Sequence, residues 1–232
     1  MAQTILVCGA GPGVSRAVAR RFGRAGHPVA LVARNPQRLE GAVEELSGEG
    51  LQVRAFPADL ADITSLGRVV EDVRAALGPI GILHWNAFLD VEGGLLEAPL
   101  SDLTGSFELR VTAYIAAVRA CLPDLEASRG AVLATCGIML LDDPRVDAFA
   151  IGYGALAIGV AAQHKATGIL AQTLAPRGVY VGEVIVNGFI EGTPGGVGKS
   201  PTVAPAAIAE AFRELYEARR EHSVIIGEAV AV

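Results

Sequence analysis

Short runs of β-branched and other apolar residues alternate with longer amphipathic stretches along the whole chain. A buried parallel strand is a nearly continuous apolar run, and parallel strands are usually joined by a helix. The alternation therefore predicts an α/β fold: a doubly wound, mostly parallel sheet with helices on both faces, in three layers. We expect strands at Ile5 to Cys8, Val29 to Ala33, Val53 to Pro57, Ile82 to Trp85, Ala131 to Thr135, Val179 to Val186 and Val224 to Ile226.

Two of the connecting stretches have unusual compositions. From Ala155 to Ala175 the chain is rich in Ala, Gly and Leu with few charges, which indicates a helix that is buried over much of its surface. From Gly192 to Pro205 it is rich in Gly, Pro and Ser, so we expect a mobile loop over a site rather than regular structure. A helix from about Ala206 to Arg220 follows. Because no linker or repeat interrupts the pattern, residues 1–232 are expected to form a single dinucleotide-binding domain, on the grounds given below.

Composition limits the partners of the chain. The formal net charge is −6 and no run of Lys and Arg occurs, so neither nucleic acid nor a membrane is an expected partner, and a small-molecule ligand is favoured. Cys8, Cys121 and Cys136 show no spacing typical of a disulfide framework or a metal site, which predicts buried thiols and no metal. The apolar start of the chain is too short for a signal-peptide core, and no apolar run has the length of a membrane span. We therefore expect a cytoplasmic location.

A glycine-rich turn joins the first predicted strand to a helix from Arg16 to Ala25. Gly9, Gly11 and Gly13 lie in this turn, and Ser15 stands just before the helix. A pyrophosphate needs close approach of the backbone, free N–H groups and the positive end of a helix dipole, and a strand, glycine turn and helix supply all three. A glycine cluster alone would be weak support. Its place after the first strand of a repeating βα chain predicts a Rossmann-type dinucleotide site rather than a merely structural turn.

The end of the second predicted strand indicates which dinucleotide binds. An NAD-preferring protein usually has an acidic residue there for the ribose hydroxyls, whereas this chain has Arg34. A guanidinium suits a 2′-phosphate, and Arg38, one helical turn further on, would reinforce the contact. We expect NADP(H) to be preferred, with NAD(H) as the alternative, although both arginines also fit a solvated surface.

With these motifs the chain resembles the short-chain dehydrogenase/reductase family over essentially its whole length. Gly9, Gly13 and Ser15 fall on the family's Gly-xxx-Gly-x-Gly loop, with Ser15 replacing the third glycine. The resemblance implies an adenine contact at Asp59-Leu60, after the third predicted strand. The cofactor-binding residues that it implies further along the chain are Asn86 and Ala87, from the family's Asn-Asn-Ala-Gly segment, and Ile190 and Thr193, from a segment like its Pro-Gly-xxx-Thr motif.

The resemblance also identifies the positions of the family's reactive groups. These are a Tyr as general acid/base, a Lys four residues later that lowers its pKa, a Ser that polarises the carbonyl and an Asn that supports a proton relay. The corresponding positions hold Leu156, Val160, Gly137 and Arg110. Neither Leu156 nor Val160 can titrate, so the fold and the cofactor loop match the family better than the reactive end does.

Neighbouring residues are weak candidates for the missing roles. If residues from 153 onward are helical, Tyr153 lies about one turn before Leu156 and His164 about one turn after Val160, on roughly the same face. A Tyr packed at a helix start and a partly buried His are the favoured interpretations. Cys136, beside Gly137, has no base that the sequence pairs with it, so we expect a buried thiol.

A second glycine motif competes for phosphate binding. Residues 193–200 miss the Gly-xxxx-Gly-Lys-Ser pattern only at its first glycine. A phosphate-binding loop must run directly into a helix, and Pro201 and Pro205 make a helix beginning at Lys199 doubtful. A flexible substrate lid is the better interpretation.

Three functions remain open at this point. The first is an NADP(H)-dependent oxidoreductase for a carbonyl/alcohol pair with an atypical or impaired active site. The second is a non-catalytic dinucleotide sensor or structural oligomer subunit, and the third is a scaffold that no longer binds the cofactor. The resemblance implies a homodimer or homotetramer, with the helix from Ala155 to Ala175 and the helix that carries Arg110 at the contact.

Overall fold

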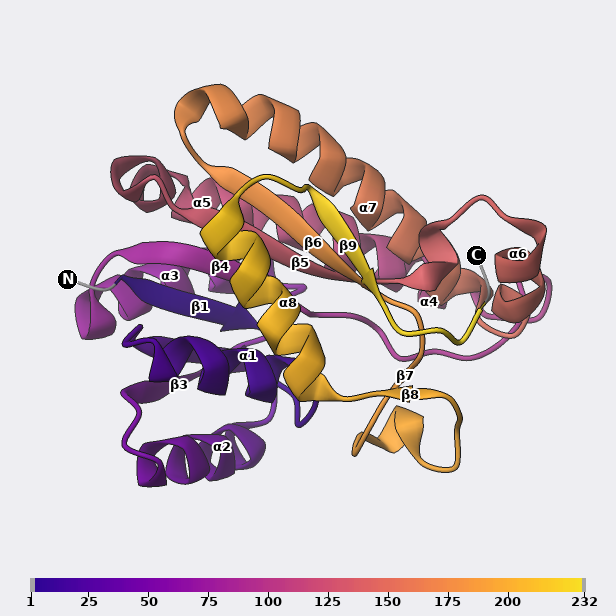
Figure 1. The fold of residues 1–232 in the computed structure, drawn as a ribbon, viewed down its shortest axis with the longest axis horizontal. Helices are drawn as coiled ribbons and strands as arrows, with labels where there is room; N and C mark the ends of the chain where they lie inside the picture. The colour runs from indigo at the N-terminus through magenta and orange to yellow at the C-terminus, as the bar shows by residue number, and fades with distance from the viewer. Residues whose placement is uncertain (1–2, 231–232) are drawn as a thin grey trace.

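The computed structural model describes residues 3–230, and its centre is a sheet of seven strands in the order β3-β2-β1-β4-β5-β6-β9 (Figure 1). Neighbouring strands of this sheet pair in parallel. The order reverses between β1 and β4, which is the point where doubly wound folds bind their ligands. The strands are β1 (Thr4–Cys8), β2 (Val29–Ala33), β3 (Val53–Pro57), β4 (Ile80–Trp85), β5 (Ala131–Gly137), β6 (Tyr180–Val186) and β9 (Ser223–Ile226).

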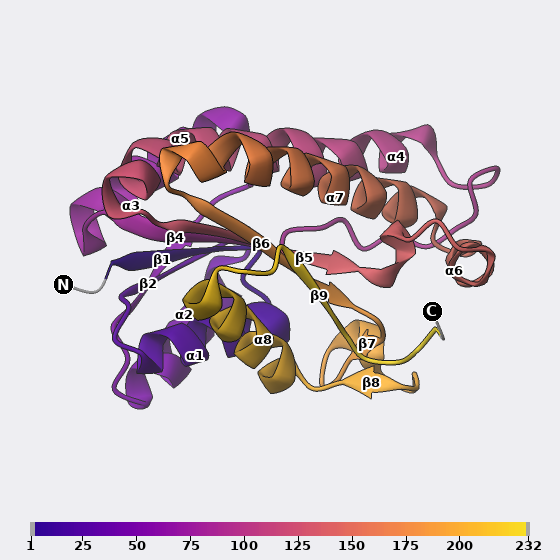
Figure 2. The ribbon, with the colours of Figure 1, turned by 45° about the horizontal axis from the view of Figure 1, so that its top comes forward.

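Helices cover both faces of the sheet and give the molecule three layers (Figure 2). One face carries α1, α2 and α8, and the other carries α3, α5 and α7. The predicted doubly wound α/β fold is therefore confirmed. The bounds of these helices are α1 (Val14–Arg24), α2 (Pro36–Gly48), α3 (Ile63–Leu77), α5 (Tyr114–Ser128), α7 (Gly154–Leu174) and α8 (Pro205–Ala218).

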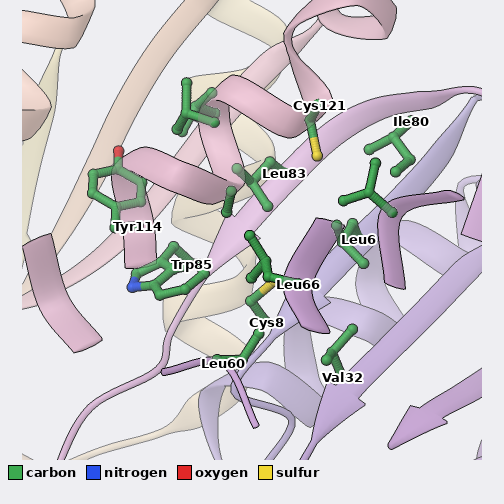
Figure 3. Packing of buried hydrophobic residues seen from close by; sticks show 14 of the residues in the cluster. Leu6, Cys8, Val32, Leu60, Leu66, Ile80, Leu83, Trp85, Tyr114 and Cys121 are labelled. Atoms are coloured by element: carbon green, nitrogen blue, oxygen red, sulfur yellow. The ribbon is translucent and has the colours of Figure 1, made fainter. Parts of the chain in front are cut away.

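The strands are apolar on both sides because helices bury both faces of the sheet. In β1, Leu6 and Cys8 pack into the core beneath α3 and α5, whereas Ile5 packs beneath α1 and α8. Figure 3 shows the first of these cores, in which the ring centres of Trp85 and Tyr114 lie 5.7 Å apart. Full burial of one aliphatic side chain of this core, such as Leu6, stabilises the fold by about 1.5–3 kcal/mol. The two cores hold the sheet rigid, so the loops at its carboxyl edge are positioned precisely enough to form a site.

Several short elements lie at the carboxyl edge. The segment 192–205, expected to be irregular, contains a 3-10 turn and the strand β8, which pairs with β7 in parallel. Backbone N–H groups of Phe189 and Glu191 donate to carbonyls of Pro201 and Val203, so the loop prediction was wrong for this part. The short elements at this edge are α4 (Leu100–Phe107), the π-helix η1 (Glu108–Ala113) that continues it, η2 (Ile138–Leu140), α6 (Pro144–Ala150), β7 (Phe189–Ile190), η4 (Pro194–Gly196) and β8 (Thr202–Val203). The 3-10 turn η3 (Ala175–Arg177) lies at the opposite edge, where it joins α7 to the start of β6.

Two further findings concern the helices and the cysteines. None of the helices within residues 3–230 combines the length and the apolar content needed to cross a membrane. Cys8, Cys121 and Cys136 are buried and carry free thiols, as the sequence predicted.

Candidate dinucleotide site and reactive end

The glycine turn lies where β1 ends beside β4. Gly9 has a φ of +83°, and a Cβ on it would lie 2.6 Å from the backbone nitrogen of Ala87. A glycine is therefore required at this position for both its conformation and its contact. The contact joins Gly9 to Ala87, two of the residues predicted to hold the cofactor.

Two hydrogen bonds fasten the same turn to the end of β4. The Ser15 hydroxyl donates to the carbonyl oxygen of Gly9 at 2.7 Å, and the Asn86 side-chain amide donates to the Ser15 oxygen at 2.9 Å. Ser15 is completely buried at the start of α1. Ser15, which the resemblance places at the family's third glycine, thus links the turn to Asn86.

Gly13 contacts the segment that follows β6. A Cβ on Gly13 would lie 2.6 Å from Cγ2 of Thr193 and 3.0 Å from Cγ2 of Ile190. The Thr193 hydroxyl donates to the Ile190 carbonyl oxygen at 2.8 Å, which fixes its side chain beside the turn. The structure therefore brings together the residues predicted from three separate motifs: the glycine turn, Asn86-Ala87 and Ile190/Thr193.

The turn has the properties that a pyrophosphate requires. The backbone N–H groups of Gly11 and Gly13 form no hydrogen bond within residues 3–230, and no heavy atom lies within 4 Å of the Cβ position of Gly11. The first turn of α1 contains no acidic residue. Free N–H groups at the positive end of a helix dipole form a favourable site for an anion, so these residues fit a dinucleotide.

The predicted adenine-ribose residues lie at the ends of β2 and β3. Arg34 is exposed and forms no ion pair with another residue of the described range 3–230, and the exposed Arg38 is likewise unpaired there. The arginines of α1 differ, because they pair with glutamates in or directly after α2 and with a glutamate of α8. Asp59 is exposed and accepts from the N–H of Ala61 at 3.0 Å, while Leu60 is buried. Arg34 is therefore available to an anionic ligand.

The reactive end has a different character. Leu156 and Val160 lie one turn apart on α7, and Val160 is only 1% exposed. Gly137 ends β5, and a Cβ there would meet no heavy atom closer than 3.9 Å. The neighbouring thiol, Cys136, is buried, and burial raises its pKa well above the usual range, so it is a poor nucleophile. Leu156, Val160 and Gly137, at three of the four positions that the resemblance assigns to the family's reactive groups, offer no side-chain proton donor.

Arg110, at the fourth position, is a buried cation in η1. Its Nη1 donates to Oε1 of Gln163 at 3.0 Å, and the amide nitrogen of Gln163 donates to the carbonyl oxygen of Thr135 at 2.9 Å. A Cβ on Gly159 would come within 3.0 Å of the Arg110 side chain, so this glycine of α7 makes room for it. The Arg110 guanidinium carbon lies 5.5 Å from the centre of the Phe88 ring. Burial lowers the pKa of Arg110 to about 10, which still leaves it charged at neutral pH.

Tyr153 and His164, the two weak catalytic candidates, are directed to different partners. Tyr153 precedes the first residue of α7, and its ring centre lies 6.1 Å from that of Phe149. His164 Nδ1 lies 2.5 Å from Oε1 of Glu183, a fully buried carboxylate of β6. The structure does not bring the two candidates together. Sequence reasoning missed Glu183, although a single acidic residue within an apolar strand was a visible signal.

Three other features lie near the reactive end. The ring of Phe189, in β7, lies 6.0 Å from Phe149, and the Lys199 ammonium lies 5.6 Å from the Phe189 ring centre. No helix begins at Lys199, as the sequence predicted, so the second glycine motif lacks the helix N-terminus that a phosphate-binding loop needs. A mainly apolar cavity of ≈ 650 Å³ lies between residues 94–97, η2, α6 and the first turns of α7, and neither Leu156 nor Val160 belongs to its lining.

A family model described as short chain dehydrogenase matches residues 3–196. The chain belongs to the short chain dehydrogenase family. A curated relative, a short chain dehydrogenase of Pseudocercospora fijiensis, is 31% identical over 184 residues, which cover 76% of this chain and 60% of that protein. The chain thus spans less than two thirds of the length of this relative.

Solved structures of low sequence identity share the fold. A blue fluorescent protein from a metagenomic library, in complex with NADPH, has a TM-score of 0.87 at 22% identity and matches over 99% of this chain and 98% of that one. A short chain oxidoreductase from Pseudomonas aeruginosa, described as containing an atypical catalytic center, has a TM-score of 0.86 at 19% identity, over 99% and 97% of the two chains.

Proposed function

We propose that the chain binds NADP(H) at the turn from Gly9 to Ser15 and acts as an oxidoreductase on a carbonyl/alcohol pair with an atypical active site. The observation that carries this proposal is the assembly of the turn. Ser15 bonds to both Gly9 and Asn86, and Gly13 contacts Thr193, while the N–H groups of the turn remain free. Family membership supports the reaction class.

The preference for the phosphorylated dinucleotide rests on Arg34. Its side chain is exposed at the end of β2 without a carboxylate partner in the described part of the chain, and no acidic residue stands there for ribose hydroxyls. A charge-assisted hydrogen bond to phosphate contributes about 1.5–3 kcal/mol. The NADPH bound to the blue fluorescent protein of the same fold supports this choice of cofactor.

The chain's own residues determine how far the reaction is assisted. When bound, the dinucleotide supplies or accepts the hydride. Leu156 and Val160 give the substrate oxygen neither a proton nor a cation, so acceleration must come mainly from orientation of the reactants. General acid/base assistance contributes about a hundredfold or more, and we expect turnover to be slow without it. The Pseudomonas aeruginosa neighbour with its atypical catalytic center is consistent with this interpretation.

A non-catalytic dinucleotide sensor or oligomer subunit is the second candidate. The burial of Val160, at 1% exposure, and the apolar Leu156 favour it, because two of the positions that carry out the family's chemistry are filled by side chains that cannot titrate. Titration with NADPH, followed by turnover measurements on a panel of aldehydes and ketones, separates the two. Binding with turnover supports the oxidoreductase, and tight binding without turnover supports the sensor. Absence of binding to either dinucleotide leaves only a scaffold.

We also propose a cytoplasmic homodimer or homotetramer that associates through α7 and the α4-η1-α5 helix. Exposed apolar side chains lie along these elements and beside them, which is unusual for a monomer's surface. They are Leu96, Leu100, Phe107, Ile151 and Ile169. Light scattering at micromolar concentration tests this, and a monomeric mass would refute it.

A further inference from the structure

Arg110 carries a positive charge that no acidic side chain of the described residues neutralises. It is only 7% exposed, and the side chain that accepts a hydrogen bond from it is the neutral amide of Gln163. Its Nε has no hydrogen-bond partner, and no carboxylate within residues 3–230 forms an ion pair with it. Burial of an unpaired cation is costly because water no longer solvates its charge. The same lack of water weakens the screening of this charge, so it interacts strongly with any other charge nearby.

The position of Arg110 relates this charge to the cofactor. Its side chain passes Gly159, next to Val160 on α7, and its guanidinium faces Phe88. Phe88 follows directly on Asn86 and Ala87, which contact the glycine turn. The uncompensated charge therefore lies between Gly159 of α7 and Phe88. In the proposed function, the segments that contain these two residues face the nicotinamide end of the bound dinucleotide.

We propose that Arg110 makes the chain select the reduced cofactor: its charge disfavours the cationic nicotinamide of NADP⁺ and leaves the neutral ring of NADPH unaffected. The inference rests on the proposed dinucleotide site and concerns only the relative affinities of its two redox forms. A unit charge roughly 12 Å away, in a medium of effective dielectric constant about 20, changes an affinity about tenfold, and a closer one changes it more. The chain then retains NADPH and releases NADP⁺, which suits a reductase or a sensor of the reduced cofactor.

The test is the ratio of the dissociation constants for NADP⁺ and NADPH, measured by calorimetry at equilibrium. In R110M we expect the ratio to fall on the order of tenfold relative to the unmodified chain. R110K keeps the charge and is expected to keep most of the ratio. The matched control is R68M, which removes an exposed arginine of α3, and it should leave the ratio unchanged.

A second variant covers the case in which R110M does not fold. Q163E places a carboxylate beside Nη1 of Arg110 and neutralises the charge without removing the arginine. It should lower the ratio as R110M does. A ratio unchanged within twofold in both R110M and Q163E, with both cofactor forms still bound, would overturn the inference alone. Failure of the unmodified chain to bind either form would overturn the proposed function, and the inference with it.

Discussion

The phosphate end and the reactive end of the candidate site differ in what holds their residues in place. At the phosphate end, the small residues of the turn are fixed by close contacts. A Cβ on Gly9 would clash with the backbone of Ala87, and removal of the Ser15 hydroxyl would remove its hydrogen bond to Gly9. At the reactive end, Gly137 has open space around it, and the sequence assigns the apolar residues Leu156 and Val160 to the positions of the family's titrating residues. The comparison teaches that binding and chemistry are separable in this fold: one rests on backbone geometry and the other on a few replaceable side chains.

The largest expected effect comes from disturbing the phosphate end. Gly9→Ala places a Cβ 2.6 Å from backbone atoms at a φ of +83°. Strain and overpacking together should lower the free energy of unfolding by about 2–5 kcal/mol and weaken NADPH binding at least tenfold. The measurements are thermal unfolding and calorimetry. Gly11→Ala, which adds a methyl group to open space, is the control for stability, and equal stability of the two variants would contradict the geometry.

A smaller effect, confined to one cofactor, is expected at Arg34. Arg34→Asp should weaken NADP(H) by on the order of 1.5–3 kcal/mol, because it removes the guanidinium that we propose to pair with the 2′-phosphate and adds a repelling charge. NAD(H) lacks that phosphate, so its affinity should fall little or rise. Arg68→Asp is the control for net charge. Equal affinities of the unmodified chain for NADP(H) and NAD(H) would contradict the assignment.

At the reactive end, His164 tests whether a suspected acid is a structural group. His164→Asn removes the ring that lies 2.5 Å from the fully buried Glu183, and the loss should cost about 1–3 kcal/mol of stability. Any turnover per folded molecule should remain unchanged. The neighbouring exposed Lys165→Ala should change neither quantity. A large fall in turnover with normal stability would show that His164 acts in the chemistry instead.

The sequence predicted the fold well because its signals were local. Apolar runs placed all seven strands of the main sheet, and the helix after Tyr153 begins at Gly154, within one residue of the predicted start. The glycine turn was predicted for the same reason, since strand, turn and helix are adjacent in the chain. Segment 192–205 was predicted less well, because β8 depends on pairing with β7 rather than on its own composition.

Long-range contacts explain what the sequence did not predict at the reactive end. Helical periodicity predicted that His164 lies on roughly the same face of α7 as Val160, but it could not predict that a carboxylate of β6 contacts the His164 ring. The link from Arg110 to Gln163 spans 53 residues, and the ring over Arg110 belongs to the segment after β4. Such contacts join elements that only the folded chain brings together, whereas composition and spacing report on neighbours in sequence.

The smallest expected effect concerns Tyr153. If Leu156 stands at the position of the family's tyrosine, the Tyr153 hydroxyl lies about one helical turn from the reacting oxygen, and the Tyr153 ring packs beside Phe149. Tyr153→Phe should then leave turnover and NADPH binding within about twofold of the unmodified chain. Tyr216→Phe, which changes a tyrosine far from the site in the core between α1 and α8, is the control and should have the same small effect. A fall in turnover of a hundredfold or more in Tyr153→Phe alone, the size of a general acid/base contribution, would show that Tyr153 has taken the acid role. The separation of binding from chemistry would then be incomplete, because the start of α7 would supply a proton that positions 156 and 160 cannot.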